Sequence, residues 1–177
     1  AVARLGRHDE AVGFLEAAAR TYAEMKDPRL EGATRIYLAE VLASGRRLAD
    51  AEAEARRSTE LLERVPILLS HALAELSVIE RARGRLADAL MTAERASVVL
   101  ERAGRSETSP VPVRLAHAEA LLAVGETGAA REQAIVARAS FEDAAARISD
   151  PTAREAYRLT VPDHARLEAL ELRLGRP

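Results

Sequence analysis

A six-residue motif that recurs along the chain is the feature that most limits how it can fold. The motif is clearest at residues 84–89 (Gly-Arg-Leu-Ala-Asp-Ala), and its last four residues repeat the sequence found 38 residues earlier. Looser copies begin at Gly6 and Gly125. The alanines that end the four copies are Ala11, Ala51, Ala89 and Ala130, at spacings of 40, 38 and 41 residues. A fixed period in this range is typical of stacked structural repeats, so the sequence predicts a repeat array.

Between the motifs, apolar residues recur at spacings of three and four, which predicts amphipathic α-helices. No stretch alternates with a period of two over the length of a strand, so the fold class is all-α. The predicted helices cover residues 9–25, 29–44, 48–64, 67–83, 86–103, 128–148, 152–160 and 163–174, with one more that runs from a cap at Ser109 and Pro110 to residue 124. Antiparallel helix pairs repeated in this way are expected to stack into a right-handed superhelical α-solenoid.

The expected organisation is one repeat domain over residues 1–177. Its repeats cover about 1–27, 28–65, 66–109 and 110–149, and a C-terminal helix pair covers 150–174. The first five residues resemble the last turns of a helix, and the chain starts without methionine partway through a repeat. We therefore expect a fragment of a larger protein.

The ends of several helices are also predicted. Asp27-Pro28 and Asp150-Pro151 each combine a capping carboxylate with a proline suited to the first helical turn. Gly45 is expected to close its helix, because glycine tolerates a positive φ angle.

Composition narrows the classes of function. The 177 residues carry a net charge of −2, which gives no basic footprint for nucleic acid. Cysteine is absent, which excludes disulfides and thiolate chemistry. No apolar run approaches the ~20 residues of a membrane-spanning helix. We expect a cytoplasmic protein that binds neither nucleic acid nor membrane.

The spacing of small residues around each turn resembles the tetratricopeptide repeat (TPR) family. In that family an alanine follows the turn glycine by five positions, with a large residue four later and a second alanine three further on. The copies here supply Ala11, Leu15 and Ala18; Ala89, Ala93 and Ala96; and Ala130, Ala134 and Ala137. The large position is alanine in two copies, the usual aromatic of the first helix is absent, and the period exceeds the standard ~34 residues.

Longer repeats of this kind resemble those of bacterial multidomain signalling proteins, such as serine/threonine kinases and transcriptional activators. Residues 154–166 are similar to the terminal segment of such repeat regions. The resemblance implies a module that serves an attached kinase or regulatory domain.

The sequence nominates no catalytic or metal site. The four histidines, His8, His71, His117 and His164, are scattered, and none lies four residues from another. The glycines stand singly at turns, without the lysine of a phosphate-binding loop. Most arginines lie three or four residues from a glutamate, as in helix-surface pairs. We therefore expect no enzyme activity, cofactor or metal.

In the TPR family the first helix of each pair lines a concave groove that receives a partner segment. Mapped onto this chain, the resemblance gives the groove positions Ile36, Glu40, His71, Ala74, Val78, Arg81, Leu115, Glu119 and Leu122. The lysine and asparagine clamp that some family members use for C-terminal carboxylates is not matched, and a mixed apolar and acidic lining takes its place.

The leading hypothesis is a non-catalytic protein-interaction scaffold of a bacterial signalling or regulatory protein. A structural spacer and a small-molecule-sensing regulatory domain are the alternatives. Self-association through the truncated first repeat is a further possibility, because Leu5, Phe14 and Leu15 would then be partly uncovered.

Overall fold

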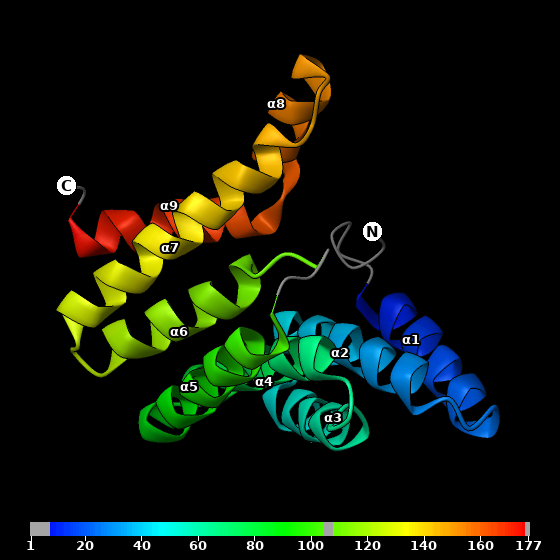
Figure 1. Ribbon diagram of the computed structural model, residues 1–177. Coiled ribbons are helices and arrows are strands. Elements are labelled where there is room, and N and C mark those ends of the chain that lie inside the picture. The colour runs from blue at the N-terminus through cyan, green and yellow to red at the C-terminus, as the bar shows by residue number, and fades with distance from the viewer. Residues whose placement is uncertain (1–7, 105–107, 176–177) are drawn as a thin grey trace.

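The helices predicted from the sequence are present in the computed structural model, which describes residues 8–104 and 108–175 (Figure 1). Within these ranges the chain forms nine helices and no strand. The helices are α1 (His8–Glu24), α2 (Pro28–Ser44), α3 (Leu48–Leu61), α4 (Pro66–Ala82), α5 (Leu86–Ala103), α6 (Val111–Ala123), α7 (Thr127–Ala146), α8 (Pro151–Thr160) and α9 (Pro162–Leu174). The helical turns expected at residues 1–5 and the exposure expected at Leu5 lie outside the described residues.

Three helix pairs form the body of the molecule: α2 with α3, α4 with α5, and α6 with α7 (Figure 1). The first helices of these pairs also contact one another, α2 with α4 and α4 with α6. The second helix of each pair contacts the first helix of the next, as α3 does with α4 and α5 with α6. This stacking is the all-α repeat solenoid that the sequence period predicts.

The motif alanines allow the helices of each pair to pack closely. Ala51, Ala89 and Ala130 are all completely buried. The Ser77 hydroxyl on α4 donates a hydrogen bond to the main-chain oxygen of Ala89 on α5, at 2.7 Å. Small side chains at these positions bring the helix backbones near enough for such a contact. The motif alanines therefore mark the contact between the helices of a pair.

The two aspartate caps are confirmed. The Asp27 carboxylate accepts a hydrogen bond from the Leu30 main-chain NH at 3.0 Å. The Asp150 carboxylate accepts one from the Ala153 NH at 2.7 Å. Each cap satisfies an NH group that has no partner within its own helix.

Gly45 closes α2, as predicted, but it is not the residue in the left-handed conformation. Gly45 has a φ angle of −79°, and the positive φ angle lies at the next residue, Arg46, with 62°. Arg46 lies five positions before the motif alanine Ala51, just as Gly84 lies five positions before Ala89. Because the turn after α2 contains one extra residue, this position falls on Arg46.

The C-terminal helices extend the array in two different ways. α8 has no buried residue and stands out beside the end of α7, where Tyr157 stacks on Phe141 with ring centres 5.2 Å apart (Figure 1). α9 packs against α6 and α7 through the buried residues Leu167, Leu170 and Leu174. α9 therefore continues the layer formed by α2, α4 and α6, and its first turn borders the hollow described next.

Candidate functional site

A cavity of about 650 Å³ lies between α2, α4, the beginning of α6 and the first turns of α9. Ile36, Leu68 and Val78 form half-buried apolar walls, and Tyr37 lies beside them with 61% of its surface exposed. The charged residues that line it are Glu40, Glu75, Asp163 and Arg166. The cavity is thus apolar along its walls and charged on several sides.

Five of the nine residues predicted for a groove line this cavity: Ile36, Glu40, His71, Ala74 and Val78. They come from α2 and α4, whose inner faces lie side by side. Their convergence follows from helical periodicity, since residues three or four apart share one face.

The other four predicted residues lie deeper in the fold or in its ion pairs. Leu115 is completely buried, so its side chain offers no surface to a partner in this structure. Leu122 is half-buried and packs against the core shared by α6, α7 and α9. Arg81 and Glu119 pair with each other, with 2.8 Å between Arg81 Nη2 and Glu119 Oε2.

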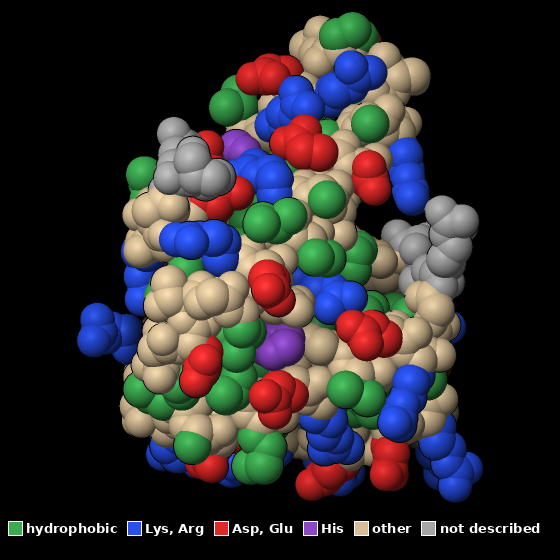
Figure 2. Space-filling model, turned by 60° about the vertical axis from the view of Figure 1, so that its left-hand side comes forward, with side chains coloured by type: hydrophobic (Ala, Val, Ile, Leu, Met, Phe, Trp, Pro, Cys, Tyr) green, Lys and Arg blue, Asp and Glu red, His purple; other side chains and the backbone are tan. Residues whose placement is uncertain are grey.

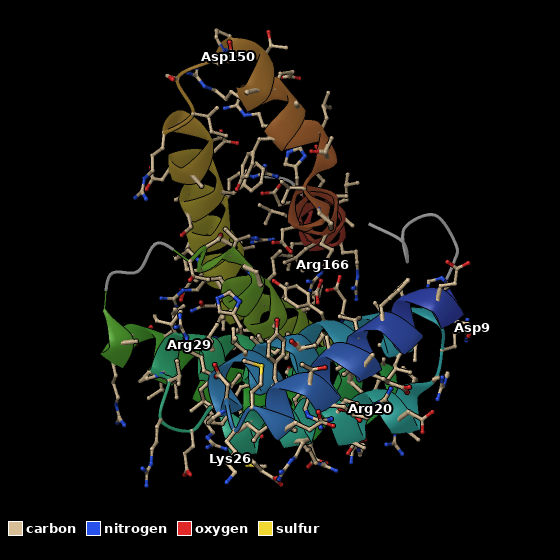
Figure 3. The ribbon with its side chains drawn as sticks, turned by 90° about the vertical axis from the view of Figure 1, so that its right-hand side faces the viewer. Asp9, Arg20, Lys26, Arg29, Asp150 and Arg166 are labelled. Atoms are coloured by element: carbon tan, nitrogen blue, oxygen red, sulfur yellow. The ribbon has the colours of Figure 1, made fainter. Side chains whose placement is uncertain are left out.

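The pair between Arg81 and Glu119 is part of a three-residue cluster. Arg166 of α9 also contacts Glu119, with 2.9 Å between Arg166 Nη2 and Glu119 Oε2. Figure 3 shows Arg166 between α9 and the helices below it. Because Glu119 is buried, two arginines compensate a charge that would otherwise be costly there. The cluster ties α4, α6 and α9 together at the edge of the cavity.

Glu75, on α4, is the most perturbed acid of the site. Burial raises the pKa of its carboxyl to about 7, and the negative charges of Glu40 and Glu119 raise it as well, whereas Arg166 opposes them. Among the described residues Glu75 and Glu40 make no hydrogen bond or ion pair. Near neutral pH the cavity therefore contains a carboxyl group that is easily switched between its neutral and charged forms.

His71 contributes a second polar group to the same wall. Its Nε2 atom is buried and finds no hydrogen-bond partner within the described part of the chain. Burial lowers the pKa of His71 below the usual value of 6.5, which favours a neutral ring at neutral pH.

Two further histidines, His117 and His164, contact side chains of neighbouring helices. His117 lies 2.9 Å from the Ser97 hydroxyl, and His164 stacks on Phe141. Over residues 8–104 and 108–175, no group of three histidine, aspartate or glutamate side chains could hold a metal ion. These two residues therefore belong to the contacts between helices.

Sequence reasoning missed Glu75, Tyr37, Leu68 and Arg166. Glu75 shares a helix face with His71 and Val78, at spacings of four and three, so a shift of one residue in the helix phase would have included it. Tyr37 and Leu68 could have been found in the same way. Arg166 had no such signal, because its position depends on how α9 docks.

Comparison with known proteins gives the fold a name. No family model matches the chain, and no curated protein matches its sequence. Among the similar solved structures are two of the "putative kinesin light chain nearly identical TPR-like repeats" of Podosopora anserina, one of them a variant. Each is 17% identical with a TM-score of 0.63, over 99% of this chain and 92% of that chain. The chain has a TPR-like repeat fold.

The surface agrees with the modest net charge of −2. On the face drawn in Figure 2, acidic and basic side chains are interspersed, and the end of α7 with α8 rises above the rest. Within the described ranges, none of the helices combines the length and apolar character that crossing a membrane requires.

Proposed function

We propose that this chain is a non-catalytic protein-interaction scaffold that binds a segment of a partner protein in the cavity between α2, α4 and α9. The observation that carries the proposal is the cavity itself, with apolar walls at Ile36, Leu68 and Val78. It also contains Glu40 and Glu75, which form no ion pair with another described residue. Repeat solenoids commonly use the surface formed by their stacked helices for binding.

The kind of protein in which this module works is proposed from the sequence. The long repeat period and residues 154–166 resemble bacterial multidomain signalling proteins, so we propose a cytoplasmic regulatory module. Its partner is a separate protein or a domain of its own parent protein. Self-association through α1 belongs to the same proposal, since Phe14 is 68% exposed there.

A paired substitution tests the binding surface. The sequence alone suggests reversing the charges of Glu40, Arg81 and Glu119. Since Glu119 binds Arg166 of α9 and also pairs with Arg81, the cleaner variant combines Tyr37→Ala with Glu40→Arg. The matched control combines Met91→Ala with Glu94→Arg, which changes an exposed apolar residue and a glutamate three residues later on α5.

The probe is a phage-displayed library of random peptides selected on the unmodified protein. We expect selected peptides to bind the control variant normally and to lose binding to the Tyr37→Ala, Glu40→Arg variant. Peptides that bind both variants equally well would show that the cavity is not the binding surface.

The second candidate function is small-molecule sensing, and the volume of the cavity favours it. Ligand pockets commonly have volumes of about 300–1,000 Å³, and this cavity has about 650 Å³. A ligand at a hundredfold excess over its Kd should stabilise the protein by about 2.7 kcal/mol. A metabolite panel that leaves the melting temperature unchanged would count against this candidate.

A further inference from the structure

The buried carboxylates of this protein follow a pattern that Glu75 breaks. Glu31, Glu52, Glu80 and Glu119 are all buried, and each pairs with at least one arginine. Glu52 forms ion pairs with three arginines, Arg56, Arg83 and Arg85. Elsewhere in the described chain, then, the fold supplies a cation wherever it buries an acid. Glu75 lies half-buried in the cavity wall and makes no hydrogen bond or ion pair with any other described residue.

We propose that the cavity binds a basic side chain, lysine or arginine, of the partner segment, with its charged end between Glu40 and Glu75. The inference rests on the proposed function and specifies the chemistry of the same site. The partner's cation takes a place like the one that arginines of this chain occupy beside the buried acids Glu31, Glu52, Glu80 and Glu119.

Within residues 8–104 and 108–175, no cation of the chain itself fills this place. Arg166 is the nearest candidate, but its guanidinium is engaged by Glu119 at 2.9 Å and by Asp163 at 3.6 Å. Arg81 is held by Glu119. His71 faces the same cavity with a ring that burial keeps neutral near pH 7. The two unpaired acids, from α2 and α4, therefore remain available to an incoming cation.

The walls suit the rest of a lysine or arginine side chain. The aliphatic part of such a side chain packs on apolar surface while its charged end reaches polar groups. Ile36 and Val78 provide that surface beside the two acids, and the cavity of about 650 Å³ has room for the chain. An acidic side chain would meet repulsion from Glu40 and Glu75 at the same place.

Binding should depend on pH with a defined sign. The charged groups around Glu75 are Glu40 from α2, Glu119 from α6 and Arg166 from α9. Since the pKa of Glu75 in the free protein is about 7, its ionised fraction rises about fourfold between pH 6.5 and 8. Lysine and arginine stay charged over this interval. Affinity for a basic peptide should therefore rise by up to about fourfold as pH increases.

The test uses the peptides selected from the random library. We expect them to contain a lysine or arginine, and replacing that residue by uncharged norleucine should weaken binding by about tenfold or more. Glu75→Gln should cause a similar loss and remove the pH dependence between 6.5 and 8. Glu16→Gln, on the exposed surface of α1, is the matched control and should change neither.

The outcomes separate this inference from the proposed function. Peptides that need Tyr37 and Glu40 but bind equally well with norleucine would overturn the basic side chain and leave the scaffold function standing. Peptides that bind regardless of the Tyr37→Ala, Glu40→Arg change, or a selection that enriches none dependent on it, would contradict both. Glu75→Gln removes an unpaired buried charge and should fold at least as well as the parent, so lost binding would not reflect unfolding.

Discussion

Arg46 has a backbone conformation that is usual for glycine, although a glycine stands directly before it. It adopts a left-handed conformation, with a φ angle of 62°, at the position that Gly84 occupies in the next repeat with 79°. A residue with a Cβ atom pays about 1–2 kcal/mol for this conformation, whereas glycine adopts it freely. Gly45, the glycine of this turn, precedes the left-handed position by one residue and has a φ angle of −79°.

We expect Arg46→Gly to stabilise the protein by about 0.5–1 kcal/mol, because relief of the steric cost outweighs the added freedom of the unfolded chain. The free energy of unfolding in urea measures this. Gly84→Ala is the reverse change at the equivalent position and should cost about 1 kcal/mol. A loss of stability in Arg46→Gly would show that the arginine side chain contributes more than its backbone costs.

The aspartate caps, by contrast, were predictable residue by residue. Asp27 and Asp150 each precede a proline, and both the capping oxygen and the proline φ angle act locally. The position of the left-handed residue depends on the count of residues between two packed helices, which is not a local property.

At the scale of helix pairs, Gly32 determines how closely α2 approaches α3. A Cβ atom at Gly32 would lie 2.6 Å from Leu62 Cγ, far inside van der Waals contact. The Ser58 hydroxyl also donates a hydrogen bond to the Gly32 main-chain oxygen, at 2.9 Å. Both observations place the two backbones unusually close.

Gly32→Ala should therefore destabilise the protein by about 1–3 kcal/mol, the usual cost of overpacking a core. The check is a double-mutant cycle with Leu62→Ala, followed by urea unfolding. Once Leu62 is shortened, the added methyl group has room, so Gly32→Ala should cost much less in that background. Equal costs in both backgrounds would show that the clash with Leu62 is not the cause.

Helix α9 was predicted as an element, but the side on which it packs was not. Its leucines lie on both faces, and only the structure distinguishes the buried Leu167 from Leu172, which is 65% exposed. Periodicity identifies a face only when the opposite face is polar, and α9 has no such contrast.

Leu167→Ala should lower the free energy of unfolding by about 2–4 kcal/mol, because it leaves a cavity between α9 and the core of α6 and α7. Leu172→Ala makes the same chemical change on the exposed face and should cost under about 0.5 kcal/mol. Thermal unfolding of the two variants side by side checks the assignment. Similar losses in both would contradict the packing of α9 described here.

For the whole molecule, the repeat architecture could be predicted because period, alanine spacing and turns all repeat. The site could be predicted in part. Ile36 and Val78 follow from the faces of α2 and α4, which helical periodicity fixes. The contact of Arg166 with Glu119 joins residues 47 positions apart, and nothing local in either segment indicates it. Leu115 was assigned to the groove by the resemblance to the TPR family, whereas in the structure it belongs to the core shared by α6, α7 and α9.

The protonation of Glu75 also arises from the whole molecule, since α2, α6 and α9 all contribute charges to its surroundings on α4. Its pKa rises from 4.5 to about 7 on folding, so the folded state holds this proton more tightly than the unfolded chain. The contribution of Glu75 to the free energy of unfolding should therefore fall as pH rises from about 4.5 to 7 and stay lowered above that.

Glu75→Gln keeps the shape of the side chain but cannot ionise. At pH 8 the variant should be more stable than the parent by about 2 kcal/mol, a figure reduced for the partial exposure of Glu75. At pH 4, where Glu75 is mostly protonated in both the folded and the unfolded parent, the two should agree within about 0.5 kcal/mol. Urea unfolding at both pH values gives the difference. His71 has the opposite pH effect on stability, but this effect cancels from the difference between the variant and the parent because both contain His71. Glu16→Gln is the control and should match the stability of the parent at both pH values.

If Glu75→Gln is instead less stable than the parent at pH 8, then Arg166 stabilises the ionised Glu75, and the cavity needs no cation from a partner.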